Sequence, residues 1–488
     1  MCSAEHPTVL LVSTPEADPN FSSNSTEDTH PTSELQEYSL LLGVAHVAMD
    51  GVGTHISSKQ LVELIGGLSP SHAEKMRTNQ QLFQLLEHEW SLRYRGPWAV
   101  QVIPPSVEER AASRDTLHAR ADFLDDQKRY VVRSTVLSNY HSSNTDSSFK
   151  GGHVIPRKPT KTRRSISHDK LFTADETSLI LKQCKKEGVT VQNAIFAGCN
   201  LSWLRILHEN SDRGEKLREQ TKAAFGGKLD WPSLLYTAAG MRGILPPLPP
   251  SHVPHSHAHL SIGYYNVMLP TDEYPALFSS DGSAGTEGGK EHLQSRRSEW
   301  FWNQAREARR QGEALMKHPN FLPRCVEHGK DRYTRAKAFA RQDDIRLGLI
   351  PPSPSPPSPT PQQPSNSSNN TASSNPNQPP NGAVPGSKPP SAALIGLSLI
   401  GDLDRVYKPH QFPSIKLLYS TSGTRKGPGA ILVFTHTFAK RLYIHVGWDK
   451  EGFEEGLMED FAEGLVACIR EFALDKVQVQ VQGELARL

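Results

Sequence analysis

Hydrophobic residues near the N-terminus form two short runs of strand length, separated by a polar stretch. Residues 8–13 read TVLLVS and residues 39–46 read SLLLGVAH. Apolar runs of roughly four to eight residues bounded by polar segments are typical of buried strands, so the two runs predict a buried hairpin. After Asp50 the period changes to that of a helix ending near Gly66, whose apolar side comprises Ile56, Leu61, Leu64 and Ile65.

From residue 172 onward the pattern alternates between helical and extended segments. Thr173 and Glu176 have the spacing of a capping box, which predicts a helix start, and Gly188 marks the end of that helix. The periodicity predicts helices at residues 193–207 and 461–472, and strands at residues 259–269, 393–400, 414–419, 431–435 and 442–446. Mixed strands and helices, split near residue 168, predict an α+β protein with an N-terminal lobe (1–168) and a C-terminal lobe (169–488).

Charge and composition argue against several classes of protein. The 488 residues include 54 Lys and Arg against 52 Asp and Glu, and the resulting net charge of +2 argues against a dedicated nucleic-acid-binding protein. No apolar stretch reaches the ~18–20 residues of a membrane span, and the N-terminus lacks the basic and apolar regions of a signal peptide. The five cysteines are scattered and show no CxxC spacing. This pattern fits a reducing compartment, so we expect a cytoplasmic protein.

Residues 351–390 differ sharply in composition from the rest of the chain. They hold 14 prolines and 9 serines, with a single charge at Lys388. Such a segment buries too little apolar surface to offset the entropy of ordering, so we predict a disordered insert in the second lobe. A plain spacer and a polyproline ligand for a partner of the SH3 or WW type are both consistent with this composition.

Candidate chemistry is concentrated in residues 46–51, HVAMDG, where the second predicted strand ends and the first helix follows. A histidine at a strand end is held rigidly, and its near-neutral pKa suits a general base. Asp50 lies past a turn, and we expect it to form a salt bridge that fixes the turn, while Gly51 allows the backbone to turn sharply. The alternative for His46 is a structural, hydrogen-bonded role.

The sequence around this motif resembles a known family. Residues 37–65, EYSLLLGVAHVAMDGVGTHISSKQLVELI, are similar to the active-site strand, turn and helix of the coenzyme A-dependent acyltransferase superfamily. This superfamily includes chloramphenicol acetyltransferase, the BAHD plant acyltransferases, fungal alcohol and trichothecene O-acetyltransferases, and the condensation domains of peptide synthetases. Further similar segments follow in the expected order at residues 171–204, 236–248, 259–270, 394–407 and 430–449.

The resemblance implies two chloramphenicol-acetyltransferase-like lobes, with mixed sheets flanked by helices and an active-site channel between the lobes. It also implies transfer of an acyl group from acyl-coenzyme A to a hydroxyl or amine of a small molecule in secondary metabolism. His46 would be the general base, Asp50 would pair with an arginine, and Gly51 would keep the turn open. Acyl-coenzyme A would be a co-substrate, with no permanently bound cofactor, no metal and no covalent enzyme intermediate.

Three further residues are candidates for the substrate channel. Tyr265 and Asn266 lie in the middle of a predicted strand, and they either face the channel or belong to the core. Ser398 occupies a position at which the resembled enzymes have small residues near the channel. His255, His257 and His259 alternate along the chain, as three ligands of a metal ion on one strand face would. A polar start of the strand explains this alternation better than a metal site does.

Two departures from the family pattern bear on function. Condensation domains usually carry two adjacent histidines, and Ala45 stands in the first of these positions, which favours a stand-alone transferase of the HxxxD type. Only 45 residues precede His46, whereas the resembled proteins have on the order of a hundred or more, so the first lobe is shortened or the sequence is incomplete. Two alternatives stay open: a condensation-like enzyme that uses carrier-bound acyl groups, and an inactive relative that serves as a binding or scaffold protein.

Overall fold

The computed structural model describes most of the second half of the chain and part of the first. The described residues are 8–13, 37–66 except 45, 47 and 48, 105–112, 153, 155–158, 164–246 except 225–228 and 230, 259–278, 287–319 and 393–474 except 428, with isolated positions between 83 and 91 and between 321 and 351. Apart from Pro351, the insert predicted at residues 351–390 lies outside this described part.

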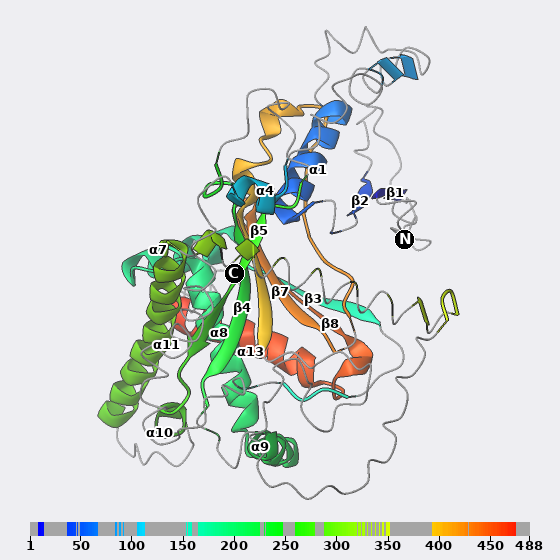
Figure 1. The fold of residues 1–488 in the computed structure, drawn as a ribbon. Helices are drawn as coiled ribbons and strands as arrows, with labels where there is room; N and C mark the ends of the chain where they lie inside the picture. The colour runs from blue at the N-terminus through cyan, green and yellow to red at the C-terminus, as the bar shows by residue number, and fades with distance from the viewer. Residues whose placement is uncertain are drawn as a thin grey trace, which may run out of the picture.

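A six-stranded mixed sheet, in the order β3-β8-β7-β6-β4-β5, forms the centre of the molecule (Figure 1). Its strands are β3 (Ser165–Leu171), β4 (Ser233–Gly240), β5 (Ile262–Leu269), β6 (Ile395–Asp402), β7 (Ile431–Phe438) and β8 (Arg441–Asp449). Strand β6 pairs in parallel with β4 and β7, and the other pairs are antiparallel. Every residue of β8 after Arg441 is buried, as expected of a strand that is covered on both faces.

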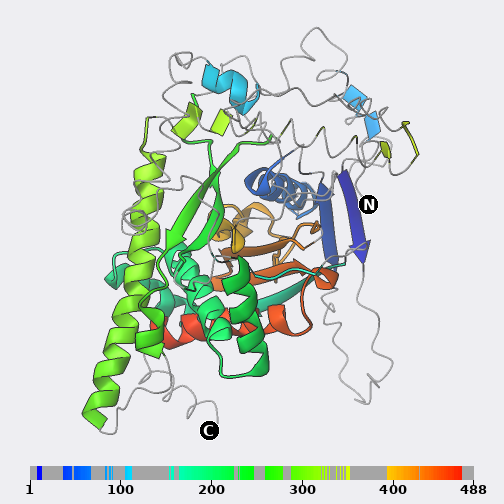
Figure 2. The same ribbon diagram turned by 60° about the horizontal axis from the view of Figure 1, so that its bottom comes forward.

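Four helices cover one face of this sheet, which we call the helical face (Figure 2). They are α7 (Ala174–Lys186), α8 (Val191–Leu207), α11 (Glu287–Met316) and α13 (Leu457–Ala473). The apolar helix α8 packs against both α11 and α13. Gly198 of α8 permits a close approach of α13, because a Cβ at this position would lie 2.7 Å from Leu465 Cδ1. The result is a large apolar core between sheet and helices.

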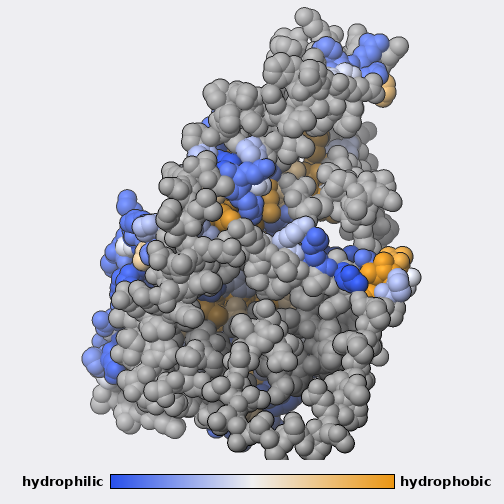
Figure 3. All heavy atoms as spheres, in the orientation of Figure 1, coloured by the Kyte–Doolittle hydropathy of each residue, from blue (hydrophilic) through white to orange (hydrophobic). Residues whose placement is uncertain are grey.

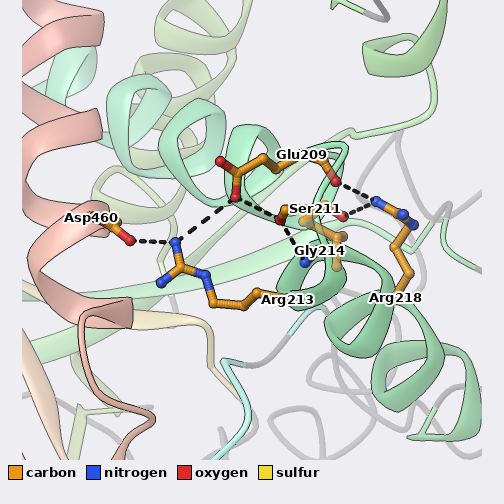
Figure 4. A network of polar contacts seen from close by, with 7 residues as sticks. Glu209, Ser211, Arg213, Gly214, Arg218 and Asp460 are labelled. Atoms are coloured by element: carbon orange, nitrogen blue, oxygen red, sulfur yellow. Dashed lines mark hydrogen bonds and ion pairs between the residues drawn. The ribbon is translucent and has the colours of Figure 1, made fainter.

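Polar contacts tie α9 (Asp212–Ala224) to the helices beside it (Figure 4). Arg213 of α9 forms an ion pair with Asp460 of α13. Arg218 donates hydrogen bonds to the backbone oxygens of Leu207 and Glu209, at the end of α8, over 3.0 Å each. Two short helices, α4 (Val107–Ala112) and α10 (Tyr274–Phe278), also belong to the described part of the chain.

The opposite face of the sheet, which we call the polar face, is covered by α1 (Gly51–Gly66) and by irregular chain (Figure 2). Val62 of α1 packs in an apolar cluster with Tyr443 of β8 and with side chains that follow β6, including Leu403 of the 3-10 turn η3 (Leu403–Arg405). Two further 3-10 turns are η4 (Pro409–Gln411) and η5 (Lys450–Gly452).

The N-terminal strands β1 (Thr8–Ser13) and β2 (Ser39–Val44) form a separate antiparallel two-stranded sheet. This hairpin lies beside α1 (Figures 1 and 2). In the orientation of Figure 1, the described part of the molecular surface is mostly hydrophilic, with small separate apolar groups (Figure 3).

The structure confirms the predicted α+β class, the first hairpin, α1 and the capping box at Thr173. Two predictions were wrong, and one helix was missed. The first half of β2 is exposed, so the hairpin is not wholly buried. Residues 414–419 form irregular chain instead of a strand, and the long helix α11 was not predicted. The division at residue 168 stays a prediction, and β3 spans this position.

Candidate active site

The Asp50 carboxylate is buried at the start of α1 and accepts three hydrogen bonds. Its Oδ1 accepts the backbone N–H of Gly53 over 2.8 Å, so Asp50 caps the helix. Its Oδ2 accepts the Arg242 guanidinium over 2.7 Å and the backbone N–H of Ser261 over 2.8 Å. The second terminal nitrogen of Arg242 donates to the backbone oxygen of His259 over 2.9 Å. Arg242 is therefore the arginine with which Asp50 pairs.

The connection between β4 and β5 explains why these donors meet at one carboxylate. Arg242 stands just after β4, and Ser261 just before β5. The two strands are antiparallel neighbours, so the end of one lies beside the start of the other. A backbone hydrogen bond of 2.9 Å from Met241 to Ser261 extends this pairing past the strand ends. The end of the sheet thus presents a guanidinium and a backbone N–H together.

His46 lies in the turn between β2 and α1, and it is exposed. The Asp50 carboxylate, by contrast, is only 1% exposed. The role expected for Gly51 needs correction. Its φ lies outside the left-handed region, and a Cβ there would meet nothing within 4 Å. The Asp50 cap, rather than the freedom of glycine, completes the turn.

The three channel candidates fall on different faces of the sheet. Asn266 is exposed and Ser398 is half-buried, and both lie on the polar face. Tyr265 lies on the helical face, where a Cβ on Gly312 of α11 would be 3.2 Å from its Oη. Since Tyr265 packs against the apolar core, the structure places it in the second of the two positions that the sequence left open.

Several titratable groups on the polar face have shifted pKa values, and the sequence analysis did not find these groups. Burial lowers the pKa of His55 and of His436 to about 4, so both rings are neutral at pH 7. A hydrogen bond with His445 lowers the pKa of Asp169. Burial also lowers the pKa of Lys426 to about 8. His55 and Asp169 are far in sequence from the other groups, which all lie between residues 426 and 445, so no local spacing in the sequence brings the whole set together.

Two cavities of about 600 and 610 Å³ lie beside α7, and in the described part of the chain neither is lined by His46, Asp50 or Arg242. The channel between the lobes therefore stays a prediction. Among the described residues there is no group of His, Cys, Asp and Glu placed to hold a metal ion. Of the three alternating histidines, His255 and His257 lie outside the described residues.

One comparison with a known structure supports the fold described above. The structure is similar to that of a trichothecene 15-O-acetyltransferase from Fusarium sporotrichioides, with a TM-score of 0.53, 13% sequence identity, and coverage of 96% of this chain and 71% of that chain. Lower similarity links it to the epimerization domain of the third module of tyrocidine synthetase B, with a TM-score of 0.41, 11% identity, and coverage of 89% and 68%. No family model and no curated protein matches the sequence.

The chain thus shares its fold with the trichothecene 15-O-acetyltransferase, in agreement with the six-stranded mixed sheet and its flanking helices. Within the described part of the chain, no helix has both the length and the apolar character that crossing a membrane requires.

Proposed function

We propose that this protein is an acyltransferase that moves an acyl group from acyl-coenzyme A to a hydroxyl or amine of a small molecule. His46 would act as the general base. It takes the proton from the acceptor group as that group attacks the thioester carbonyl. The C–S bond then breaks, and the leaving thiolate receives the proton from the imidazolium, so that no covalent enzyme intermediate forms.

One observation carries this proposal: the two polar groups of the HxxxD motif are placed in opposite ways. Asp50 is buried, and both its oxygens are engaged by Gly53, Arg242 and Ser261. Moving it toward a ligand would leave a guanidinium and two backbone N–H groups without their acceptor, which is costly in a buried site. His46, four residues earlier, is exposed. The arrangement suits a fixed carboxylate that supports the turn and a histidine that handles the proton.

The proposal is tested by thiol release from acetyl-coenzyme A in the presence of a panel of small alcohols and amines. We expect His46→Ala to lower kcat/KM by roughly 10²- to 10⁴-fold, the usual contribution of a general base. The matched control is His292→Ala, because His292 is an exposed histidine of α11, on the helical face. This control should keep the activity of the unchanged protein.

Each alternative outcome has a distinct meaning. If His46→Ala releases thiol as fast as the unchanged protein, the role of general base is wrong. If acyl-coenzyme A is inert but a carrier-bound acyl group reacts, the condensation-like alternative is correct. If neither donor reacts with any acceptor, the protein is an inactive relative with a binding role.

A further inference from the structure

Residues 419–422 cross the polar face as irregular chain, and three successive residues of this segment each contact a different buried histidine. The backbone oxygen of Ser420 accepts a hydrogen bond of 2.9 Å from His436 Nε2. The Thr421 hydroxyl lies 3.2 Å from His445 Nδ1. The Ser422 hydroxyl lies 2.9 Å from His55 Nε2. We call residues 419–422 the strap.

The three histidines come from three different elements and form one cluster. His436 belongs to β7, His445 to β8 and His55 to α1. The rings of His436 and His445 stack with centroids 5.2 Å apart, and the His55 ring lies 6.4 Å from that of His436. Asp169 of β3 contacts the same nitrogen of His445 as Thr421 does, with a distance of 3.0 Å between Oδ1 and Nδ1. The strap therefore contacts both the sheet and α1.

His55 alone among these histidines belongs to the helix that follows the HxxxD motif. The residue is 4% exposed. Its Nδ1 lies 3.0 Å from the Tyr407 hydroxyl, so both ring nitrogens contact side chains of the second half of the chain. Each partner is a hydroxyl, which can donate or accept, so either neutral tautomer of the ring is satisfied.

The two hydrogen bonds of His55 give α1 a second polar anchor besides Asp50. The contacts of Asp50 fix the start of α1, and Val62 packs in an apolar cluster nearer its end. His55 lies about one turn after Asp50, and its two hydrogen bonds limit the tilt and rotation of the first turns of the helix. The turn that carries His46 leads directly into the same helix, so its orientation follows that of α1.

We infer that His55 is a positioning residue that, through Tyr407 and the strap, holds the first turns of α1 and so sets the orientation of His46. The inference deepens the proposed function and rests on it. Displacements of about 1 Å in a reacting group can reduce a rate on the order of a hundredfold, so this second anchor bears directly on turnover.

The test removes single hydroxyl groups and leaves the imidazole in place, because His55→Ala would open a cavity and could prevent folding. Tyr407→Phe and Ser422→Ala each delete one partner of the ring. In the thiol-release assay we expect each to lower kcat roughly tenfold with little change in KM, because substrate binding does not depend on the anchor. Ser422→Thr keeps a hydroxyl and should restore most of the turnover. Ser295→Ala, which deletes an exposed hydroxyl of α11, is the matched control and should behave as the unchanged protein.

A second measurement does not depend on activity. Hydrogen exchange of the full chain, read by mass spectrometry, should become at least severalfold faster in peptides of α1 in Tyr407→Phe and Ser422→Ala, while peptides of α8 stay unchanged. Unchanged exchange in α1 would overturn the inference, as would kcat within twofold of the unchanged protein. If the unchanged protein releases no thiol from any donor, the proposed function fails, and exchange in α1 alone decides whether His55 positions the helix.

Discussion

The two faces of the six-stranded sheet are held by different kinds of contact. On the helical face, α8 lies in a large apolar core between the sheet, α11 and α13, with a few polar contacts such as that of Asn200 with Gln304. On the polar face, α1 packs Val62 into a small apolar cluster and is held besides by an ion pair, by helix capping and by the hydrogen bonds of a histidine. Apolar contacts have no preferred direction, whereas each hydrogen bond requires one. The face on which α1 depends on directional contacts is the one that carries the candidate site.

The largest expected effect of a substitution comes from breaking the ion pair on the polar face. Arg242→Leu leaves the Asp50 carboxylate buried without its cation, so we expect unfolding in urea to show a loss of about 3–5 kcal/mol. Adding Asp50→Asn should recover part of this loss, because the uncompensated charge is gone. Arg310→Leu breaks an exposed pair with Glu307 on α11 and should cost about 1 kcal/mol or less. Equal losses of unfolding free energy for Arg242→Leu and Arg310→Leu would contradict the difference proposed between the two faces.

A change of pH acts on the buried histidines of the polar face. His55 and His436 have a pKa of about 4 in the folded protein and about 6.5 when unfolded. Between these values the unfolded chain binds protons that the folded protein does not, so stability falls as the pH drops from about 6.5 to about 4, by up to about 3 kcal/mol for each ring.

The groups that face these rings are Tyr407 at His55, and His445, Tyr443 and Asp169 near His436. The pKa of Asp169 is already lowered, so this carboxylate titrates only in the acidic part of the range or below it. Urea unfolding at pH 7, 6 and 5 measures the effect. A free energy of unfolding that stays constant from pH 7 to pH 5 would contradict the prediction.

The smallest expected effect lies on the helical face. Gly198→Ala places a Cβ 2.7 Å from Leu465 Cδ1, and the side chain of Leu465 must move. The overpacking exceeds the helix propensity gained, so we expect a net loss of about 1 kcal/mol, seen as a lower Tm. Gly51→Ala is the matched control, since a Cβ there meets nothing within 4 Å, and it should leave Tm unchanged or raise it. A higher Tm for Gly198→Ala would show that the helices pack more loosely than described.

Features that depend on local chemistry could be predicted from the sequence. The capping box at Thr173 forms as expected, with its hydroxyl accepting from the backbone N–H of Glu176 over 3.1 Å. The run at residues 414–419 suggested a strand, but no strand among the described residues pairs with it. The helix α11 was missed because its polar composition hides the period, although pairs such as Arg309 and Glu313 are spaced for it.

The candidate site also has one part that local sequence predicts and one part that it does not. The motif with His46 and Asp50 is local in sequence, so it could be found by its spacing and its place between a strand and a helix. Its support is not local, because Arg242 and the histidines of the strap approach only through the pairing of distant strands. Nothing in their immediate sequence distinguishes them from surface residues.

The distances along the chain between these partners have a consequence for how the protein forms. Asp50 and Arg242 are 192 residues apart, and His55 and Tyr407 are 352 residues apart. Contacts between such remote segments are the slowest to form, because a large loop must close before they offer any stabilisation. During synthesis the beginning of α1 leaves the ribosome long before its partners exist. The histidine of the motif therefore acquires its final surroundings near the end of folding, and a nascent chain that stops before residue 407 lacks both hydrogen-bond partners of His55.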